Sequence, residues 1–236
     1  MIEILNIFYL FLISGIIFSF PLHNTYLKKK LSLTKLNLFE IYSLNTLIIL
    51  TVFFIFSFFG ININFIFFSI LFLSLINFFY IDWKLFFNNF YLLIFFSLFY
   101  LVFSVEISTY PYLEWDAAVN WIFKTLNFKN NYSFQNLENV PGILGYPHLG
   151  TFIWAFFWEI SFINHEYTGR LSFIFIYLLV FFSIIERLKI NHFLKIVFLI
   201  FLIVISFDRI LFNGYQEPLM FSLCAIFIML LTQIHS

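Results

Sequence analysis

The sequence predicts an all-α, polytopic membrane protein with about seven transmembrane helices and one further helix at the outer face. Three observations support this class: 63% of the 236 residues are hydrophobic, only 10% are charged, and the mean hydropathy is +0.99. Soluble domains carry about 25% charged residues, so this composition excludes a soluble enzyme and also a disordered chain. Twelve basic residues balance twelve acidic ones, which excludes a strongly basic nucleic-acid binder.

The cysteine and phenylalanine content does not indicate a catalytic or binding site. The single cysteine, Cys224, cannot form an intramolecular disulfide, and we expect a buried, inert thiol because it lies in an apolar run. The chain contains 41 phenylalanines. Because lipid accepts Phe and Leu almost equally, we interpret phenylalanine stripes as packing rather than as aromatic binding sites.

Four apolar segments of about the 20-residue length that a bilayer requires precede residue 108. They cover residues 5–22, 41–60, 63–81 and 90–107. Four lysines at residues 28–35 follow the first segment, whereas a secretory signal carries its positive charges first, so we expect this helix to be retained. Gly60-Ile61-Asn62 predicts a tight turn between the second and third segments.

A polar stretch at residues 108–146 interrupts this pattern and is the first place to look for chemistry. Further apolar segments follow at residues 149–162, 171–185, 193–207 and 219–231. The predicted organisation is four transmembrane helices (1–108), an outer, catalytic-type loop with interfacial helices (109–169), and three transmembrane helices (170–236) that enclose a second outer loop at 208–217.

Positive charge marks the cytoplasmic side, so the lysines of residues 28–35 place that loop inside and the 108–146 stretch outside. Segment 149–162 decides the rest. If it is interfacial or re-entrant, eight of the twelve basic residues lie inside, against seven if it spans. The segment is also short for a span, so we favour the interfacial or re-entrant placement.

This topology gathers most acidic residues at the outer face, which indicates an outward-facing polar site. Eight of the twelve are Glu106, Glu114, Asp116, Glu138, Glu159, Glu166, Asp208 and Glu217.

The first candidate group of site residues begins at Glu114 and Asp116. From Trp115 onward the sequence predicts a short amphipathic helix, on which Asp116, Asn120 and Lys124 share one face at i, i+4 and i+8. Asp116 has two interpretations: a helix-capping acid, or a carboxylate that deprotonates a hydroxyl or holds a metal.

Three further groups lie on the outer side. Tyr146 and His148 open the segment at 149–162, and a lone His is typically a polar interfacial side chain, although it could also donate a hydrogen bond at a site. Arg170 precedes a span and either snorkels to the interface or clamps a phosphate. The second outer loop carries Asp208, Arg209 and Glu217, which either cap helices or bring a second carboxylate to the face that bears Asp116.

These motifs, taken in order, resemble the GT-C superfamily of membrane glycosyltransferases, which includes protein O-mannosyltransferases and the aminoarabinose transferases of lipid A. The matching segments are Glu114-Trp115-Asp116, Tyr146-Pro147-His148-Leu149, Thr168-Gly169-Arg170-Leu171-Ser172 and Gly214-Tyr215-Gln216-Glu217-Pro218. His148 and Ser172 replace family prolines, and Glu217 replaces an aspartate. The resemblance covers about residues 110–231, roughly half of the chain.

The resemblance implies transfer of a sugar, with inversion, from a polyprenyl-phosphate donor to a glycan, lipid or protein acceptor. Asp116 would be the general base, and Arg170, Lys124 or Arg209 would stabilise the leaving lipid phosphate. Glu217 or Asp208 would orient the acceptor, or would ligate a divalent cation where one is used.

The same resemblance also implies further substrate contacts, a cellular location and an incomplete chain. Glu114, Tyr146 and His148 would contact substrate. The expected location is a bacterial inner membrane with the site facing the periplasm or exterior, and no nucleic acid is involved. Because such enzymes have more spans and often a soluble C-terminal domain, we expect an N-terminal part or a truncated form.

Two other classes stay open: a polytopic transporter or flippase, and a non-catalytic membrane component of a surface-polysaccharide pathway. Transporters place polar groups near the bilayer midplane on broken helices. Here the polar residues inside the predicted spans are mostly Asn and Ser, such as Asn45, Ser69 and Asn77. No ionisable residue lies in the middle of a predicted span, which argues against an ion-coupled carrier.

Overall fold

The computed structural model describes residues 2–31, 33, 35–134, 148–206 and 212–234. These residues form helices and one isolated β-bridge. In chain order the helices are α1 (Ile2–Ser19), α2 (Thr25–Lys30), α3 (Leu38–Phe59), α4 (Ile63–Phe78), α5 (Trp83–Asn88), α6 (Phe90–Thr109), the π-helical turn η1 (Ala117–Trp121), α7 (Ile122–Lys129), α8 (Leu149–Glu159), α9 (Tyr167–Arg187), α10 (His192–Ser206) and α11 (Glu217–Ile234).

The all-α class is confirmed for the described residues, and the protein carries helices suited to a membrane. Four helices, α1, α3, α6 and α9, are long and apolar enough to cross a bilayer. The helices α4, α10 and α11 are equally apolar but shorter. Large apolar side chains such as Phe65, Phe68 and Phe72 are exposed on the surface of α4. A surface of this kind suits lipid and not water.

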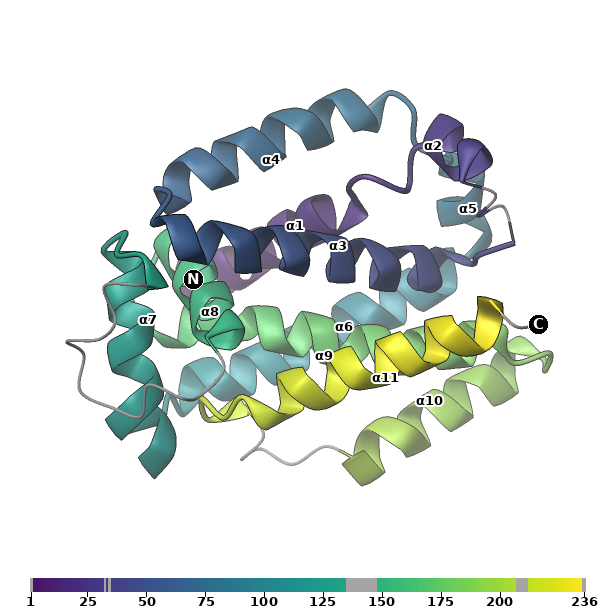
Figure 1. Cartoon of the computed structure of the whole chain (residues 1–236). Coiled ribbons are helices and arrows are strands. Elements are labelled where there is room, and N and C mark those ends of the chain that lie inside the picture. The colour runs from purple at the N-terminus through teal and green to yellow at the C-terminus, as the bar shows by residue number, and fades with distance from the viewer. Residues whose placement is uncertain (1, 32, 34, 135–147, 207–211, 235–236) are drawn as a thin grey trace.

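The helices α1, α3, α4, α6, α9, α10 and α11 run roughly along one direction, whereas α7 lies across one end of the bundle (Figure 1). The central helix is α9, which packs against α1, α3, α6, α8, α10 and α11 and is buried along nearly all of its length. Helix α8 packs against α7, α9 and α3. With 11 residues it is about 16 Å long, which is roughly half of a bilayer core.

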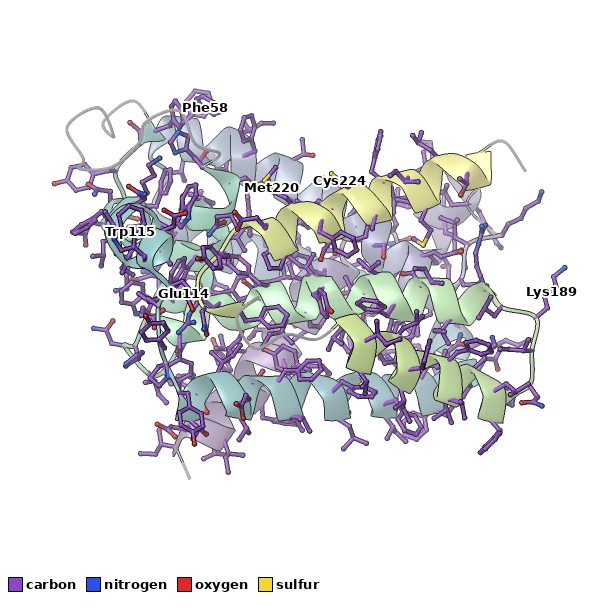
Figure 2. All side chains as sticks on the ribbon, turned by 90° about the horizontal axis from the view of Figure 1, so that it is seen from below. Phe58, Glu114, Trp115, Lys189, Met220 and Cys224 are labelled. Carbon is purple, nitrogen blue, oxygen red and sulfur yellow. The ribbon has the colours of Figure 1, made fainter. Side chains whose placement is uncertain are left out.

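The two ends of the bundle differ in charge. Glu114 and Trp115 lie at the end that carries α7 and α8, which we call the α7–α8 end (Figure 2). Lys189 lies at the opposite end, together with α2 and α5 (Figures 1 and 2). Lys28, Lys29 and Lys30 form the last turn of α2, so we call this the lysine-rich end.

Local caps explain where several helices begin. Gly60 adopts the left-handed conformation after α3, and the Asn62 side chain accepts the amides of Asn64 and Phe65 at the start of α4, which confirms the predicted tight turn. At the lysine-rich end the Glu186 carboxylate of α9 accepts the amides of Leu38 and Phe39, at 3.0 and 2.8 Å. This long-range cap fixes the start of α3 against the end of the central helix.

The expectation for the cysteine is wrong. Cys224 is exposed on the surface of α11 rather than buried (Figure 2). An apolar run does not distinguish the core-facing side of a membrane helix from the lipid-facing side, because both are apolar.

Candidate functional site

The first predicted site residues lie where the chain leaves α6 and enters η1. Trp115 and Asp116 begin the helical segment, and the amide of Ala118 donates to the Glu114 carbonyl, at 2.9 Å. The Asp116 side chain accepts no capping hydrogen bond, so the capping interpretation does not describe this residue. Its half-exposed carboxylate still lies in the first helical turn, where the macrodipole favours negative charge.

Asp116, Asn120 and Lys124, which are expected to share one helix face, differ in burial. Asn120 and Lys124 are buried, with 6% and 1% of their surface exposed, whereas Asp116 is half-exposed. Asp116 lies in the first turn of the helical segment, whereas the two later positions pack into the interior.

Lys124 therefore has an interior position. Its ammonium lies 5.4 Å from the centre of the Trp121 ring, and burial lowers the pKa of the ammonium. A buried amine of this kind contributes to the packing of α7 and is poorly placed to meet a bulky lipid phosphate.

The second outer loop packs directly onto this segment. The Glu114 amide donates to the Asn213 carbonyl, at 3.0 Å. Gly214 has a φ of 94°, and a side chain there would place its Cβ 2.6 Å from the Cβ of Ala117. A residue without a side chain is thus needed for the two segments to approach each other.

Three carboxylates from the two segments lie near enough to one tyrosine to affect its ionisation. The pKa of the half-buried Tyr215 phenol is raised, first by burial and then by the negative charges of Glu114, Asp116 and Glu217. Glu217 is 101 positions from Asp116 and 103 from Glu114 in the sequence, yet all three raise the pKa of the same phenol. That Glu217 comes to the face bearing Asp116 stays a prediction.

Arg170 is the internal connector of the site. Its guanidinium is fully buried, and it donates to the carbonyls of Tyr112 and Phe212, at 3.1 and 2.7 Å. It also pairs with the Glu166 carboxylate at 2.8 Å. In this position the guanidinium has no exposed surface for a lipid phosphate, and it does not snorkel either. Its contacts instead position both outer segments against α9.

Glu166 completes this connection from the start of α9. Burial raises the pKa of its carboxyl, and the opposing charge of Arg170 acts in the other direction. Its carbonyl accepts the indole N–H of Trp154, at 2.7 Å. Trp154 is fully buried, and its carbonyl lies so close to Gly169 that any side chain there would overlap it. The close α8–α9 contact therefore depends on Gly169.

The start of α8 borders the second loop. His148 is largely buried and meets the Phe134 ring edge-to-face, with ring centres 4.2 Å apart. Two residues later, Gly150 lies against the Gln216 side chain. His148 is thus close to the second loop through its neighbours, and its ring also contacts Phe134.

Three predicted site residues, Tyr146, Asp208 and Arg209, lie outside the described residues. Within the part of the chain that the structure describes, no group of three or more His, Cys, Asp or Glu side chains is arranged to hold a metal ion.

Two residues of the site were not singled out from the sequence. Tyr215 was noted only as part of a motif, and Glu166 only as one of many outer acids. The i, i+4 spacing of Glu166 and Arg170 was available as a signal, because it predicts an ion pair on a helix. No comparable signal marked Tyr215, since its neighbours come from a distant segment.

Comparison of the chain with protein-family models, with curated proteins and with solved structures finds no match.

Proposed function

We propose that the protein is a membrane glycosyltransferase that moves a sugar from a polyprenyl-phosphate donor to an acceptor hydroxyl at the α7–α8 end. The observation that carries this proposal is the contact between the Glu114–Ala117 and Asn213–Glu217 segments, which brings Glu114, Asp116 and Glu217 near Tyr215 at the α7–α8 end. A half-exposed carboxylate beside further acids and a phenol can accept a proton from an alcohol. A lipid-linked donor explains why such a site is placed on apolar helices.

Asp116 is the base in this mechanism. It takes the proton of the acceptor hydroxyl while that oxygen bonds to the anomeric carbon from the face opposite the lipid phosphate. The bond from the anomeric carbon to the phosphate oxygen breaks, and the lipid phosphate leaves with the electron pair, so the configuration inverts. Glu217 orients the acceptor, and Glu114 is the third carboxylate of this group.

The other predicted roles change with the geometry. Arg170 holds the two outer segments together and does not contact the donor, because its guanidinium is buried against protein acceptors. Lys124 is likewise assigned to packing. Stabilisation of the leaving phosphate then falls to Arg209, the remaining base of the second loop, which lies outside the described residues.

The proposed topology has seven spans, with α8 embedded at the outer face. Three arguments support it: the helices α1, α3, α4, α6, α9, α10 and α11 alternate in direction, α8 is about 16 Å long, and the lysines concentrate at the end opposite Glu114. The shorter helices α4, α10 and α11 then cross a locally thinned bilayer.

This topology predicts the accessibility of two engineered cysteines. In a Cys224→Ser background, cysteines at the exposed positions Asn130 and Asn191 should react with a membrane-impermeant maleimide from opposite sides of the membrane. Asn130 follows α7, whereas Asn191 precedes α10 at the lysine-rich end. Labelling of intact cells and of inverted vesicles measures this, and reaction of both cysteines from the same side would exclude seven spans.

The activity itself is tested with the purified chain in vesicles. We expect transfer of radiolabel from a synthetic polyprenyl-phosphate-linked sugar to a membrane-extract acceptor, with the free lipid phosphate as the second product. A flipping assay on the same vesicles serves as the counter-test. Movement of the labelled lipid across the bilayer without any transfer would favour a flippase and contradict the proposal.

A further inference from the structure

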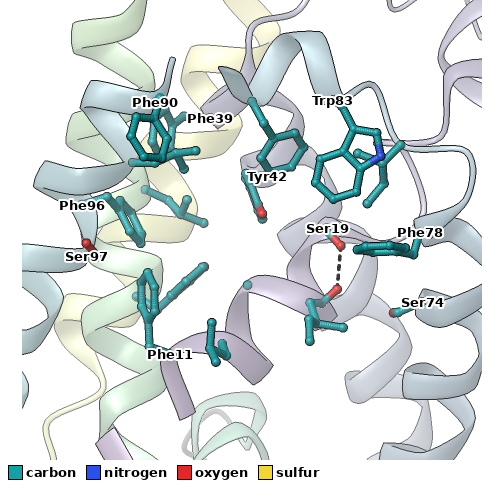
Figure 3. Close-up of a pocket in the computed structure, with 18 of the residues that line it drawn as sticks. Phe11, Ser19, Phe39, Tyr42, Ser74, Phe78, Trp83, Phe90, Phe96 and Ser97 are labelled. Atoms are coloured by element: carbon teal, nitrogen blue, oxygen red, sulfur yellow. Dashed lines mark hydrogen bonds between the residues drawn. The ribbon is translucent and has the colours of Figure 1, made fainter. Parts of the chain in front are cut away.

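A cavity of about 560 Å³ lies in the N-terminal half of the bundle, near the lysine-rich end (Figure 3). Residues of α1, α3, α4, α5, α6 and α9 line it. The lining is mostly aromatic and aliphatic, with Phe11, Phe39 and Phe96 among its side chains (Figure 3). Cavities that bind drug-sized ligands have volumes of about 300–1,000 Å³, so this one is large enough for a ligand.

The few polar groups of the lining do not form a polar site. Ser19 already donates its hydroxyl to the Ile16 carbonyl, at 2.7 Å (Figure 3). No Asp, Glu, Lys, Arg or His is among the lining residues. The chemistry that fits such a wall is a hydrocarbon chain, since burying a charged or strongly polar ligand here would leave it without partners.

Open space beside one helix of the cavity wall indicates where a hydrocarbon chain would lie. Gly15 of α1 lines the cavity, and a Cβ built on it meets nothing within 4 Å. Gly169 and Gly214, in contrast, are packed so tightly that a Cβ would overlap a neighbour. Gly15 therefore leaves the helix surface uncovered where a ligand could contact it.

The rim of the cavity at the lysine-rich end is positively charged, and a β-bridge and an ion pair hold its segments together. Asn24, just before α2, forms a β-bridge with Ile81, which lines the cavity. Lys28 pairs with Asp82 at 3.7 Å, so the acidic group at this rim is already neutralised. Trp83 lines the cavity, and the exposed Lys84 directly follows it on α5.

We propose that this cavity binds one acyl chain of an anionic glycerophospholipid taken from the leaflet at the lysine-rich end. The phosphate contacts Lys84 and the exposed lysines of α2, Lys29 and Lys30, and Trp83 lies at the level of the headgroup. Charge complementarity selects the anionic lipid, because juxtamembrane lysines attract acidic headgroups. The site lies at the opposite end of the bundle from the carboxylates around Tyr215, so the proposal does not depend on the glycosyltransferase assignment.

The test titrates the purified full chain in detergent with dibrominated phosphatidylglycerol, and separately with dibrominated phosphatidylcholine that has the same chains. Bromine quenches nearby tryptophan, and Trp83 is the tryptophan that lines the cavity. We expect saturable quenching at lower concentrations of phosphatidylglycerol than of phosphatidylcholine. A Trp83→Phe variant should lose this quenching component.

Two pairs of variants distinguish the contribution of the acyl chain to binding from that of the headgroup. Gly15→Phe fills the open space and should weaken binding by at least about tenfold, the effect of losing two buried methylenes, whereas Gly15→Ala should change it little. Lys84→Gln should weaken binding of phosphatidylglycerol about fivefold. Lys189→Gln, at an exposed lysine on the α9–α10 turn, should have no effect and is the matched control.

Three outcomes would overturn the proposal of a bound anionic lipid. Equal quenching by phosphatidylcholine would remove the selection by charge, and unchanged quenching in Gly15→Phe would place the chain elsewhere. Stronger competition by a polyprenyl phosphate than by phosphatidylglycerol would make the cavity a donor site. If the protein binds phosphatidylglycerol but transfers no sugar, this would contradict the glycosyltransferase proposal and leave the lipid proposal intact.

Discussion

Replacement of Asp116 by asparagine is expected to lower the rate of sugar transfer by about 10²–10⁴-fold, the usual effect of losing a general base. The amide has the same shape as the carboxylate but cannot accept the hydroxyl proton. Asp116 makes no capping hydrogen bond and is half-exposed, so the substitution should leave the fold and the membrane insertion unchanged. Initial rates with the lipid-linked donor, at equal amounts of inserted protein, measure the effect.

The control is the same chemical change at the other end of the bundle. Asp82→Asn removes a carboxylate whose partner is Lys28, at 3.7 Å, and it should leave the transfer rate within about twofold of the wild type because such partly exposed pairs are weak. Glu114→Gln and Glu217→Gln then rank the other two carboxylates around Tyr215. Full activity of Asp116→Asn, with loss in one of these, would move the base to that residue.

Arg170→Ala is expected to lower the free energy of unfolding by about 3–5 kcal/mol, which is a large share of the stability of a typical domain. The substitution leaves the buried Glu166 carboxylate without its partner. It also removes the donor to the Tyr112 and Phe212 carbonyls, which join the two outer segments to α9. Unfolding of the purified protein in mixed micelles, monitored by tryptophan fluorescence, measures the loss.

A paired replacement distinguishes positioning from donor binding. Arg170→Met combined with Glu166→Leu removes both buried charges and should recover much of the unfolding free energy, since apolar residues often replace buried ion pairs well. Sugar transfer should stay low in this double variant, because the Tyr112 and Phe212 carbonyls still lack their donor. Lys189→Ala is the stability control, as it removes an exposed lysine from the other end of the protein. An Arg170→Ala protein of normal stability with weakened donor binding would instead support a direct phosphate contact.

The helices were largely predictable from hydropathy. The segments expected at 41–60, 63–81 and 90–107 correspond to α3, α4 and α6, with ends displaced by a few residues. The short segment at 149–162 corresponds to α8. Apolar length predicts such elements well, because a helix in lipid must satisfy its own backbone and is bounded by the polar residues at its ends.

The orientation of individual side chains was predicted less well. The i, i+4 rule predicts that Lys124 shares a face with Asp116, but Lys124 is buried whereas Asp116 is half-exposed. Cys224 was expected inside and lies outside. In both cases the local sequence was compatible with either orientation, and packing against other helices decided between them.

The sequence by itself determined a helical membrane protein, the approximate bounds of its apolar helices and a set of outer acids that includes Asp116. Hydrophobic length and charge scarcity are properties of single segments, so they need no knowledge of neighbours. Only the tertiary structure decided that Glu114, Asp116 and Glu217 act on one tyrosine, that Arg170 is a buried connector, and that a cavity opens beside Gly15. These features depend on contacts between segments as much as 100 residues apart, and in an apolar sequence the pattern of hydrophobicity does not encode which faces meet.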